Sequence, residues 1–253
     1  MSLDNEVWIE PGDGSEKQLA IWRPDLSGTP KGALILVHSM GDQPLTSKTM
    51  RPLQDHLSLQ GWASLSIGGP EVNKTSAPLK QTELQARAVS TLNAAMAFLH
   101  SKGQYNIALL GDGLGNAWVW SFAQQLTGMP ETGPAKTQTL RSNTQSAEVS
   151  YDIRAIIMLN THDAMLANPY LDEAFSQWPA KAPYPILDIY VENYGHSSPL
   201  AKKRRDQARQ LGLTKYRQKR FPATPPLHLT EQNALFKYIR GFLDSQAEGI
   251  QLR

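Results

Sequence analysis

The sequence contains no cysteine, which excludes disulfide bonds, thiolate zinc sites and a cysteine nucleophile. It also lacks an excess of charge of either sign, since 25 Lys and Arg residues stand against 23 Asp and Glu residues and give a formal charge of +2. That balance is unlike the broad basic face that binds a phosphate backbone, so we expect no nucleic-acid partner. No apolar run reaches the roughly 18 residues of a membrane-spanning helix, so we expect no membrane span.

Positive charge is concentrated in one place, the run KKRR at residues 202–205. It lies in the stretch SPLAKKRRDQARQLG, where Leu200, Ala208 and Leu211 have helical spacing and can face the protein interior. We therefore expect a helix whose cations all point to solvent.

Two alternating segments open the chain, EVWIEP at residues 6–11 and KQLAIWRP at residues 17–24, and the GDG between them is typical of a hairpin turn. Farther along, five short runs rich in Ile, Leu and Val have the composition of strands that are covered on both faces. These runs are GALILVHS, ASLSIGG, NIALLGD, IRAIIMLN and PILDIYV. Together they predict a mostly parallel sheet that begins with an antiparallel hairpin.

Helical segments alternate with these strands. They lie at residues 50–60, 81–100, 116–126, 199–211 and 230–243, and Thr230 has the residue type of a helix N-cap. The alternation predicts right-handed crossovers and a three-layer α/β sandwich that forms one domain over residues 1–253. Two stretches depart from it, a polar loop at 127–150 and a partly apolar segment at 161–184 that could cover a site as a lid.

The order of these parts resembles the α/β-hydrolase fold. The likeness rests on the opening hairpin, a strand that ends in HSMG (residues 38–41), a strand that runs into GDGLG (111–115) before a helix, and His228 ahead of the closing helix. More narrowly, the segments LAIWRPD, GDGLGNAW and PILDIY resemble a bacterial family of exported α/β-hydrolase-like proteins of unknown function that lack the nucleophilic serine. The resemblance implies an α/β-hydrolase fold over nearly the whole chain and a periplasmic location.

The segment GDGLG resembles the nucleophile elbow of that superfamily, which reads GxSxG in working hydrolases. Gly111 and Gly115 fit the two outer glycines, and Gly113 stands where the serine is expected. A glycine at this place relieves about 1–3 kcal/mol of backbone strain and supplies no nucleophile. A Gly-rich phosphate loop is the alternative interpretation, although the segment has neither a GK[ST] ending nor GxGxxG spacing.

The resemblance also gives positions for the acid and the base of a catalytic triad. Tyr194 falls where the acid is expected, and Glu192, two residues earlier, is a substitute. His228 falls at the histidine position, where it could act as a base only with a proton donor nearby; a hydrogen bond within a loop is its alternative role. The triad positions are thus Gly113, Glu192 and His228, and the triad is degenerate.

The segment HSMG resembles the oxyanion loop, in which backbone amides receive the developing negative charge. Ser39 and Leu114 would supply those amides here. Without a nucleophile, the same donors can hold a carboxylate or a carbonyl group of a ligand. The ligand-binding candidates are His38, Ser39, Asp112, Gly113, Leu114 and His228.

A metal site is a further hypothesis, because imidazole and carboxylate side chains follow several strands whose ends should meet at one edge of the sheet. Such side chains can ligate zinc or another divalent ion, and a metal-bound water would replace the lost hydroxyl. No HExxH or similar local signature accompanies them, and residues of these types commonly cap helices or bond to the backbone after a strand. The candidates are His38, Asp112, His162, Asp163, Glu192 and His228.

Glycine at the nucleophile position and the lack of a clear acid predict a non-catalytic protein, a pseudoenzyme that binds a small molecule or a protein in the bacterial envelope and uses no cofactor. Two alternatives stay open: an esterase-like hydrolase with a metal-bound water or an unconventional nucleophile, and a protein-interaction module that docks its partner on the loop 127–150. We expect a periplasmic location, with the cytoplasm as the alternative, since the absence of cysteine fits both. The opening MSLDNE contains no signal-peptide core and is compatible with a chain from which a leader was removed.

Overall fold

The fold is taken from a computed structural model of the chain. The structure describes residues 5–39, 42–69, 81–128, 153–160, 184–191, 197–221 and 229–247. The loop predicted at 127–150 and the lid predicted at 161–184 lie almost entirely outside these ranges. Within them, no helix has both the length and the hydropathy needed to cross a membrane.

The described strands form one eight-stranded sheet in the order β1-β2-β4-β3-β5-β6-β7-β8. Its strands are β1 (Asn5–Ile9), β2 (Gln18–Arg23), β3 (Gly32–Val37), β4 (Trp62–Ile67), β5 (Ile107–Asp112), β6 (Ile153–Leu159), β7 (Ile186–Val191) and β8 (Tyr216–Phe221). The pairs β1–β2 and β2–β4 are antiparallel, and every later pair is parallel. The predicted hairpin and mostly parallel sheet are confirmed.

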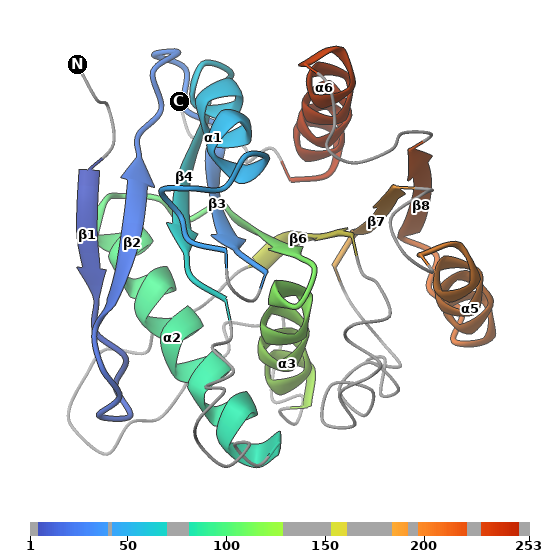
Figure 1. Ribbon diagram of the computed structural model, residues 1–253, viewed down its shortest axis with the longest axis horizontal. Helices are drawn as coiled ribbons and strands as arrows, with labels where there is room; N and C mark the ends of the chain where they lie inside the picture. Colours follow the sequence, from blue (N-terminus) through green and yellow to red (C-terminus); the bar gives the residue numbers. More distant parts are fainter. Residues whose placement is uncertain are drawn as a thin grey trace, which may run out of the picture.

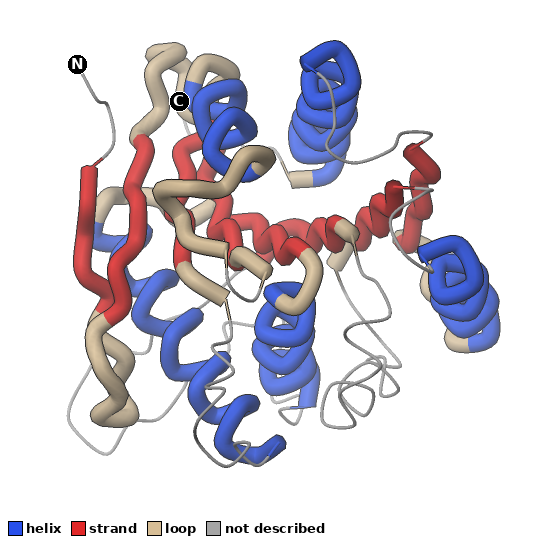
Figure 2. Tube along the Cα trace, in the orientation of Figure 1, coloured by secondary structure: helices blue, strands red, loops and turns tan. Residues whose placement is uncertain are grey.

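Helices cover both faces of this sheet, which confirms the predicted three-layer sandwich (Figures 1 and 2). They are α1 (Met50–Ser58), α2 (Gln81–Ser101), α3 (Gly115–Gly128), α5 (Ser197–Gln210) and α6 (Leu229–Gln246). Helices α1 and α6 pack on one face, while α2, α3 and α5 lie on the other. Because α6 begins at Leu229, Thr230 lies inside the first turn of the helix, and its prediction as the N-cap is wrong.

The sheet has one hydrophobic core on each face, which explains why the central strands have continuous apolar sequences. All six residues of β3 are buried, and they alternate between the cores: Ile35 and Val37 pack with α2 and α3, whereas Leu34 and Leu36 pack with α1 and α6. A strand covered on both faces has no polar side, so its sequence shows no alternation.

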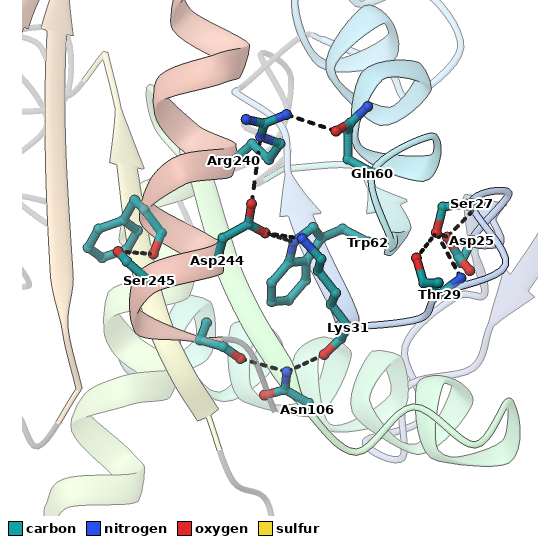
Figure 3. Close-up of polar contacts among 12 residues, drawn as sticks. Asp25, Ser27, Thr29, Lys31, Gln60, Trp62, Asn106, Arg240, Asp244 and Ser245 are labelled. Carbon is teal, nitrogen blue, oxygen red and sulfur yellow. Dashed lines mark hydrogen bonds and ion pairs between the residues drawn. The ribbon is translucent and has the colours of Figure 1, made fainter. Parts of the chain in front are cut away.

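At the amino ends of the central strands, Asp244 of α6 joins three elements (Figure 3). Its carboxylate accepts hydrogen bonds from Lys31 Nζ at 2.9 Å and from Trp62 Nε1 at 3.0 Å. Arg240 Nε lies 3.6 Å from the same carboxylate. The bonds from Lys31 and Trp62 attach α6 to the amino ends of the strands, opposite to the strand ends where ligands bind in such folds, whereas Arg240 belongs to α6 itself.

Two further features differ from expectation. The sequence YRQKRF was not predicted to form a strand, yet it forms β8 at the edge of the sheet. Arg204, expected to point to solvent with its neighbours, is only 6% exposed and faces the sheet. The prediction of an entirely solvated cationic run is therefore wrong at this residue.

Candidate ligand site at the nucleophile elbow

The turn between β5 and α3 has the shape of a nucleophile elbow. Gly113 adopts a φ of +49°, in the left-handed region that favours glycine. Its N–H donates to the carbonyl oxygen of Leu159 at 2.9 Å, so the turn is continuous with the hydrogen-bond ladder to β6. The backbone conformation expected at the serine position is present, but no side chain occupies it.

The two outer glycines are required by close packing rather than by dihedral angle. A Cβ on Gly111 would lie 2.7 Å from the backbone N and Cα of Asn116. A Cβ on Gly115 would lie 2.6 Å from the carbonyl oxygen of His38, closer than real Cβ atoms approach. The elbow therefore holds the first turn of α3 against both its own strand and the end of β3.

Asn116 fixes the elbow from within α3. Its Nδ2 donates to the carbonyl oxygens of Gly113 at 3.0 Å and Leu159 at 2.9 Å. The residue is 1% exposed, so these bonds satisfy carbonyl groups that burial would otherwise leave without water. This clamp holds the position of the turn.

Ser39 lies directly against the elbow. The N–H of Leu114, one of the two amides expected to line an oxyanion hole, donates to Ser39 Oγ at 3.2 Å. The serine hydroxyl thus occupies a position on this amide that a ligand oxygen would take. A ligand that binds the Leu114 amide has to displace this hydroxyl.

His38 is fully buried at the end of β3 and contacts Ser66 Oγ of β4 through its Nε2. Its Nδ1 has no hydrogen-bond partner in the described part of the chain. Burial lowers the pKa of the imidazole from 6.5 to about 4, because a charged ring would lose its hydration. At neutral pH His38 is therefore an uncharged, enclosed side chain.

Asp112 ends β5 immediately before Gly113 and is half-buried. Desolvation by burial raises the pKa of its carboxyl group to about 7, and the nearby charge of Asp42 acts in the same direction. The hydrogen bond from Asn160 Nδ2 to Asp112 Oδ1, at 3.0 Å, opposes the shift. The carboxyl group can therefore carry or release a proton near neutral pH.

The site brings together His38, Ser39, Asp112, Gly113 and Leu114 at the carboxyl ends of β3 and β5. The other predicted residues, Glu192, Tyr194, His162, Asp163 and His228, lie outside the described residues. Among the residues that are described, no group of three or more potential ligand side chains is arranged to hold a metal ion.

Sequence reasoning missed Asn160, which follows β6 and bonds to Asp112. Its φ of +51° is unusual for a residue other than glycine, but asparagine is among those that tolerate it. The final Asn of the apolar run IRAIIMLN was the available signal. Its side-chain Oδ1 is buried and has no hydrogen-bond partner within the described ranges.

A second buried carboxylate, Asp188 in β7, lies away from these strand ends and is completely surrounded by donors. Arg204 of α5 binds it through two nitrogen atoms, Nε at 2.8 Å and Nη2 at 3.1 Å. Tyr216 OH donates at 2.6 Å and Gln218 Nε2 donates at 2.9 Å, both from β8. The cluster joins β7, α5 and β8.

A family model described as "Protein of unknown function (DUF3530)" matches residues 2–91 and 80–245. The chain belongs to this family. No curated protein matches the sequence significantly.

Three hydrolases are among the solved structures that are similar to this chain. A soluble variant of monoglyceride lipase from Saccharomyces cerevisiae, in complex with a substrate analog, has a TM-score of 0.68 and 14% identity, and the match covers 98% of this chain and 97% of the lipase. Dienelactone hydrolase from Anabaena variabilis has a TM-score of 0.64 at 14% identity, with 97% and 100% of the two chains covered. The esterase domain of a Rhodothermus marinus protein has a TM-score of 0.61 at 13% identity, with 96% and 99% covered. At such low identity these matches establish the α/β-hydrolase fold and not the activity.

Proposed function

We propose that this protein binds a ligand at the nucleophile elbow of an α/β-hydrolase fold and does not carry out serine-dependent acyl transfer. The observation that carries the proposal is Gly113, which keeps the left-handed turn of the elbow but has no side chain to attack a carbonyl carbon. In serine hydrolases the fold, the turn and the nucleophile work together. Here the fold and the left-handed turn are present, but Gly113 supplies no nucleophile.

Ser39 is a poor replacement for the missing nucleophile. Its Oγ accepts the N–H of Leu114, whereas an attacking serine needs a base that accepts its proton. The adjacent His38 turns its Nε2 to Ser66 instead. Within the described residues, no side-chain base is bonded to Ser39 Oγ.

The chemistry of the site favours a small ligand with a carbonyl or carboxylate oxygen for the Leu114 amide and a polar group beside Asp112. The amide is already positioned by the elbow, and a ligand oxygen would exchange with the Ser39 hydroxyl. Asn160 Oδ1 offers an acceptor next to the Asp112 carboxyl group. Both polar ends of such a ligand would lie at the strand ends where α/β sheets bind ligands.

Labelling by a fluorophosphonate probe tests the absence of serine-dependent chemistry. We expect no stoichiometric labelling of the native protein. The matched variant Ser39→Ala identifies Ser39 if labelling occurs, because only a reaction at that hydroxyl disappears in the variant. Labelling that heat denaturation abolishes would overturn the proposal.

A thermal-shift screen of small carboxylates and esters tests ligand binding, with Asp112→Ala as the variant that should weaken the response. An ester-substrate panel, run with and without chelator, tests the alternative of a metal-dependent hydrolase. Turnover that chelation removes would replace the binding role by that activity. If small molecules fail to bind, a pull-down with and without residues 127–150 tests the protein-interaction alternative.

We also propose a location in the bacterial envelope. Its support is the sequence resemblance to exported α/β-hydrolase-like proteins. Fractionation of native cells into periplasmic and cytoplasmic extracts, followed by immunodetection, tests it; recovery in the cytoplasmic extract alone would contradict it.

A further inference from the structure

The nearly neutral chain is strongly asymmetric in charge. Residues 197–221, which form α5, β8 and the turn between them, contain nine of the 25 Lys and Arg residues but only one of the 23 Asp and Glu residues, Asp206. We call this region the basic end. Since the formal charge of the whole chain is +2, the rest of the chain is net acidic. The basic end lies at one extremity of the molecule, and β1 lies at the other (Figure 1).

Folding presents most of these cations to solvent. On α5, the inward stripe is Ala201, Arg204 and Ala208, and Arg204 is neutralised by Asp188. The exposed cations of the basic end include Lys202, Lys203, Arg205, Arg209 and Arg217. They come from both a helix and the edge strand beside it, so the positive surface is broader than one helix face.

Neighbouring α6 extends this surface. Lys219 of β8 lies over the ring of Tyr238, with its Nζ 5.2 Å from the ring centroid, and Lys237 is exposed next to that tyrosine. Among the described residues of α6, Tyr238 is the one large hydrophobic side chain that is exposed, and the lysine covers its ring. Among its described residues, this surface therefore offers charge, with little exposed apolar area for insertion into a bilayer and no aromatic ring free of a covering cation for stacking against a base.

We propose that the basic end binds the anionic surface of a phospholipid bilayer, as a peripheral and salt-sensitive contact. An anionic membrane surface is larger than the protein, so it attracts the basic end and repels the acidic rest of the chain. The charge asymmetry therefore draws the protein to the membrane and orients it with the basic end toward the lipids. Clustered Lys and Arg residues are the usual feature that anionic lipids recognise. The proposal is independent of the ligand site at the elbow, whose residues are not in this region.

Sedimentation with vesicles tests the proposal. The full chain is mixed with vesicles of phosphatidylcholine alone and of phosphatidylcholine with phosphatidylglycerol, at low and high NaCl. We expect binding only to the anionic vesicles, and its loss at high salt. For the triple variant Lys202→Gln, Lys203→Gln and Arg205→Gln, we expect the partition coefficient to fall about 100-fold, the effect of removing three cations near an anionic membrane.

The control removes three exposed cations elsewhere and keeps the net charge equal to that of the first variant: Lys17→Gln, Lys48→Gln and Lys102→Gln. It should bind like the unmodified chain. If the first variant fails to fold by circular dichroism, Arg209→Gln with Arg217→Gln tests the same surface from other residues. Failure of the unmodified chain to bind anionic vesicles, or equal losses in variant and control, would overturn the proposal. So would duplex DNA that displaces the vesicles and depends on the same cations, since the partner would then be nucleic acid.

Discussion

Two carboxylates of the sheet, Asp188 and Asp112, lie in contrasting environments. Asp188 is in the middle of β7, fully buried, and accepts four side-chain hydrogen bonds, two of them from Arg204. Asp112 is at the carboxyl end of β5, half-buried, and accepts one side-chain hydrogen bond, from Asn160, in the part of the chain described. Both are acids in a packed sheet, but their partners differ.

This difference separates a structural carboxylate from a candidate ligand group. Where the backbone brings a cation and two neutral donors to a carboxylate, the group is neutralised internally and joins three elements. Where a carboxylate lies at a strand end with one amide donor, its raised pKa records incomplete compensation for lost water. A ligand can supply the hydrogen-bond donors that the protein does not provide to this carboxylate.

The largest expected effect is on the Asp188 cluster. Asp188→Asn leaves the buried guanidinium of Arg204 without its counter-charge, and we expect the free energy of unfolding to fall by about 3–5 kcal/mol. Desolvation acts to lower the pKa of Arg204, but the Asp188 carboxylate outweighs it and the pKa is raised, so the buried guanidinium is charged and Asp188 compensates that charge. Urea unfolding followed by circular dichroism measures the loss.

The double variant Asp188→Asn with Arg204→Met is the control for that experiment. It removes the buried charge as well as its partner, and we expect it to be more stable than the single variant. If the free energy of unfolding of Asp188→Asn fell by less than about 1 kcal/mol, Asp188 would not be the structural carboxylate of the two.

The second prediction concerns His38, the buried group that neighbours the elbow. Its pKa is about 4 in the folded protein, against the ordinary value of 6.5 for a solvated histidine, so the unfolded chain takes up a proton first as the pH falls. Stability from the neutral ring is therefore present above pH 6.5 and is lost between pH 6.5 and 4, by about 3 kcal/mol. Urea unfolding at intervals of pH across this range should show the free energy of unfolding falling as the pH falls. The slope of this free energy against pH should be smaller in His38→Gln. An unchanged slope in the variant would assign the acid sensitivity to other groups.

The third prediction applies the substitution made at Asp188 to the other carboxylate. The pKa of Asp112 is raised from 3.8 to about 7, so the stability associated with its protonated form is present below pH 3.8 and lost as the pH rises through 7. Asp112→Asn keeps an acceptor for Asn160 and removes the charge. At pH 8 we expect the variant to be more stable than the unmodified protein by about 1–3 kcal/mol, and the difference should shrink toward pH 4.

Chemical unfolding of both proteins at pH 4, 6 and 8 checks this result. The control is Glu16→Gln, which removes an exposed carboxylate that is not among the causes of the Asp112 shift. The same Asp→Asn change would then destabilise the protein at residue 188 and stabilise it at residue 112. Equal losses at the two positions would remove the distinction between them.

The sequence predicted the parts of the fold that follow from local pattern. Runs such as GALILV are apolar throughout because both faces of β3 are covered, and the glycine spacing of GDGLG reflects the close approach of α3. The strand β8 was missed because its sequence, YRQKRF, has little apolar content at a sheet edge that needs none. Burial of Arg204 was missed for a different reason: its partner Asp188 is 16 residues away in sequence and on another element.

The sequence also predicted which residues meet at the candidate site, but not their side-chain contacts. Gly113, Asp112 and Ser39 could be grouped because the carboxyl ends of parallel strands meet at one edge. The bond from the Leu114 amide to the Ser39 hydroxyl could not, because it depends on the side-chain rotamer of Ser39. The left-handed backbone of Asn160 likewise depends on how β6 ends beside β7, whose Ile189 carbonyl accepts its N–H.

The smallest expected effect is at Gly113, and it separates the shape of the elbow from its chemistry. Because φ is +49°, both Gly113→Ala and Gly113→Ser place a side chain in a left-handed conformation and should cost about 1–2 kcal/mol of stability. Gly113→Ser restores the GxSxG pattern, yet we expect no ester turnover, because Tyr194 stands where the resemblance places the catalytic acid and the enclosed His38 beside the elbow is turned to Ser66. Urea unfolding measures the loss of stability in the two variants, and an ester-substrate assay measures their turnover. If Gly113→Ser hydrolyses esters and Gly113→Ala does not, a functional base and acid survive around the elbow, and the loss of one hydroxyl is then the whole difference between this protein and a hydrolase.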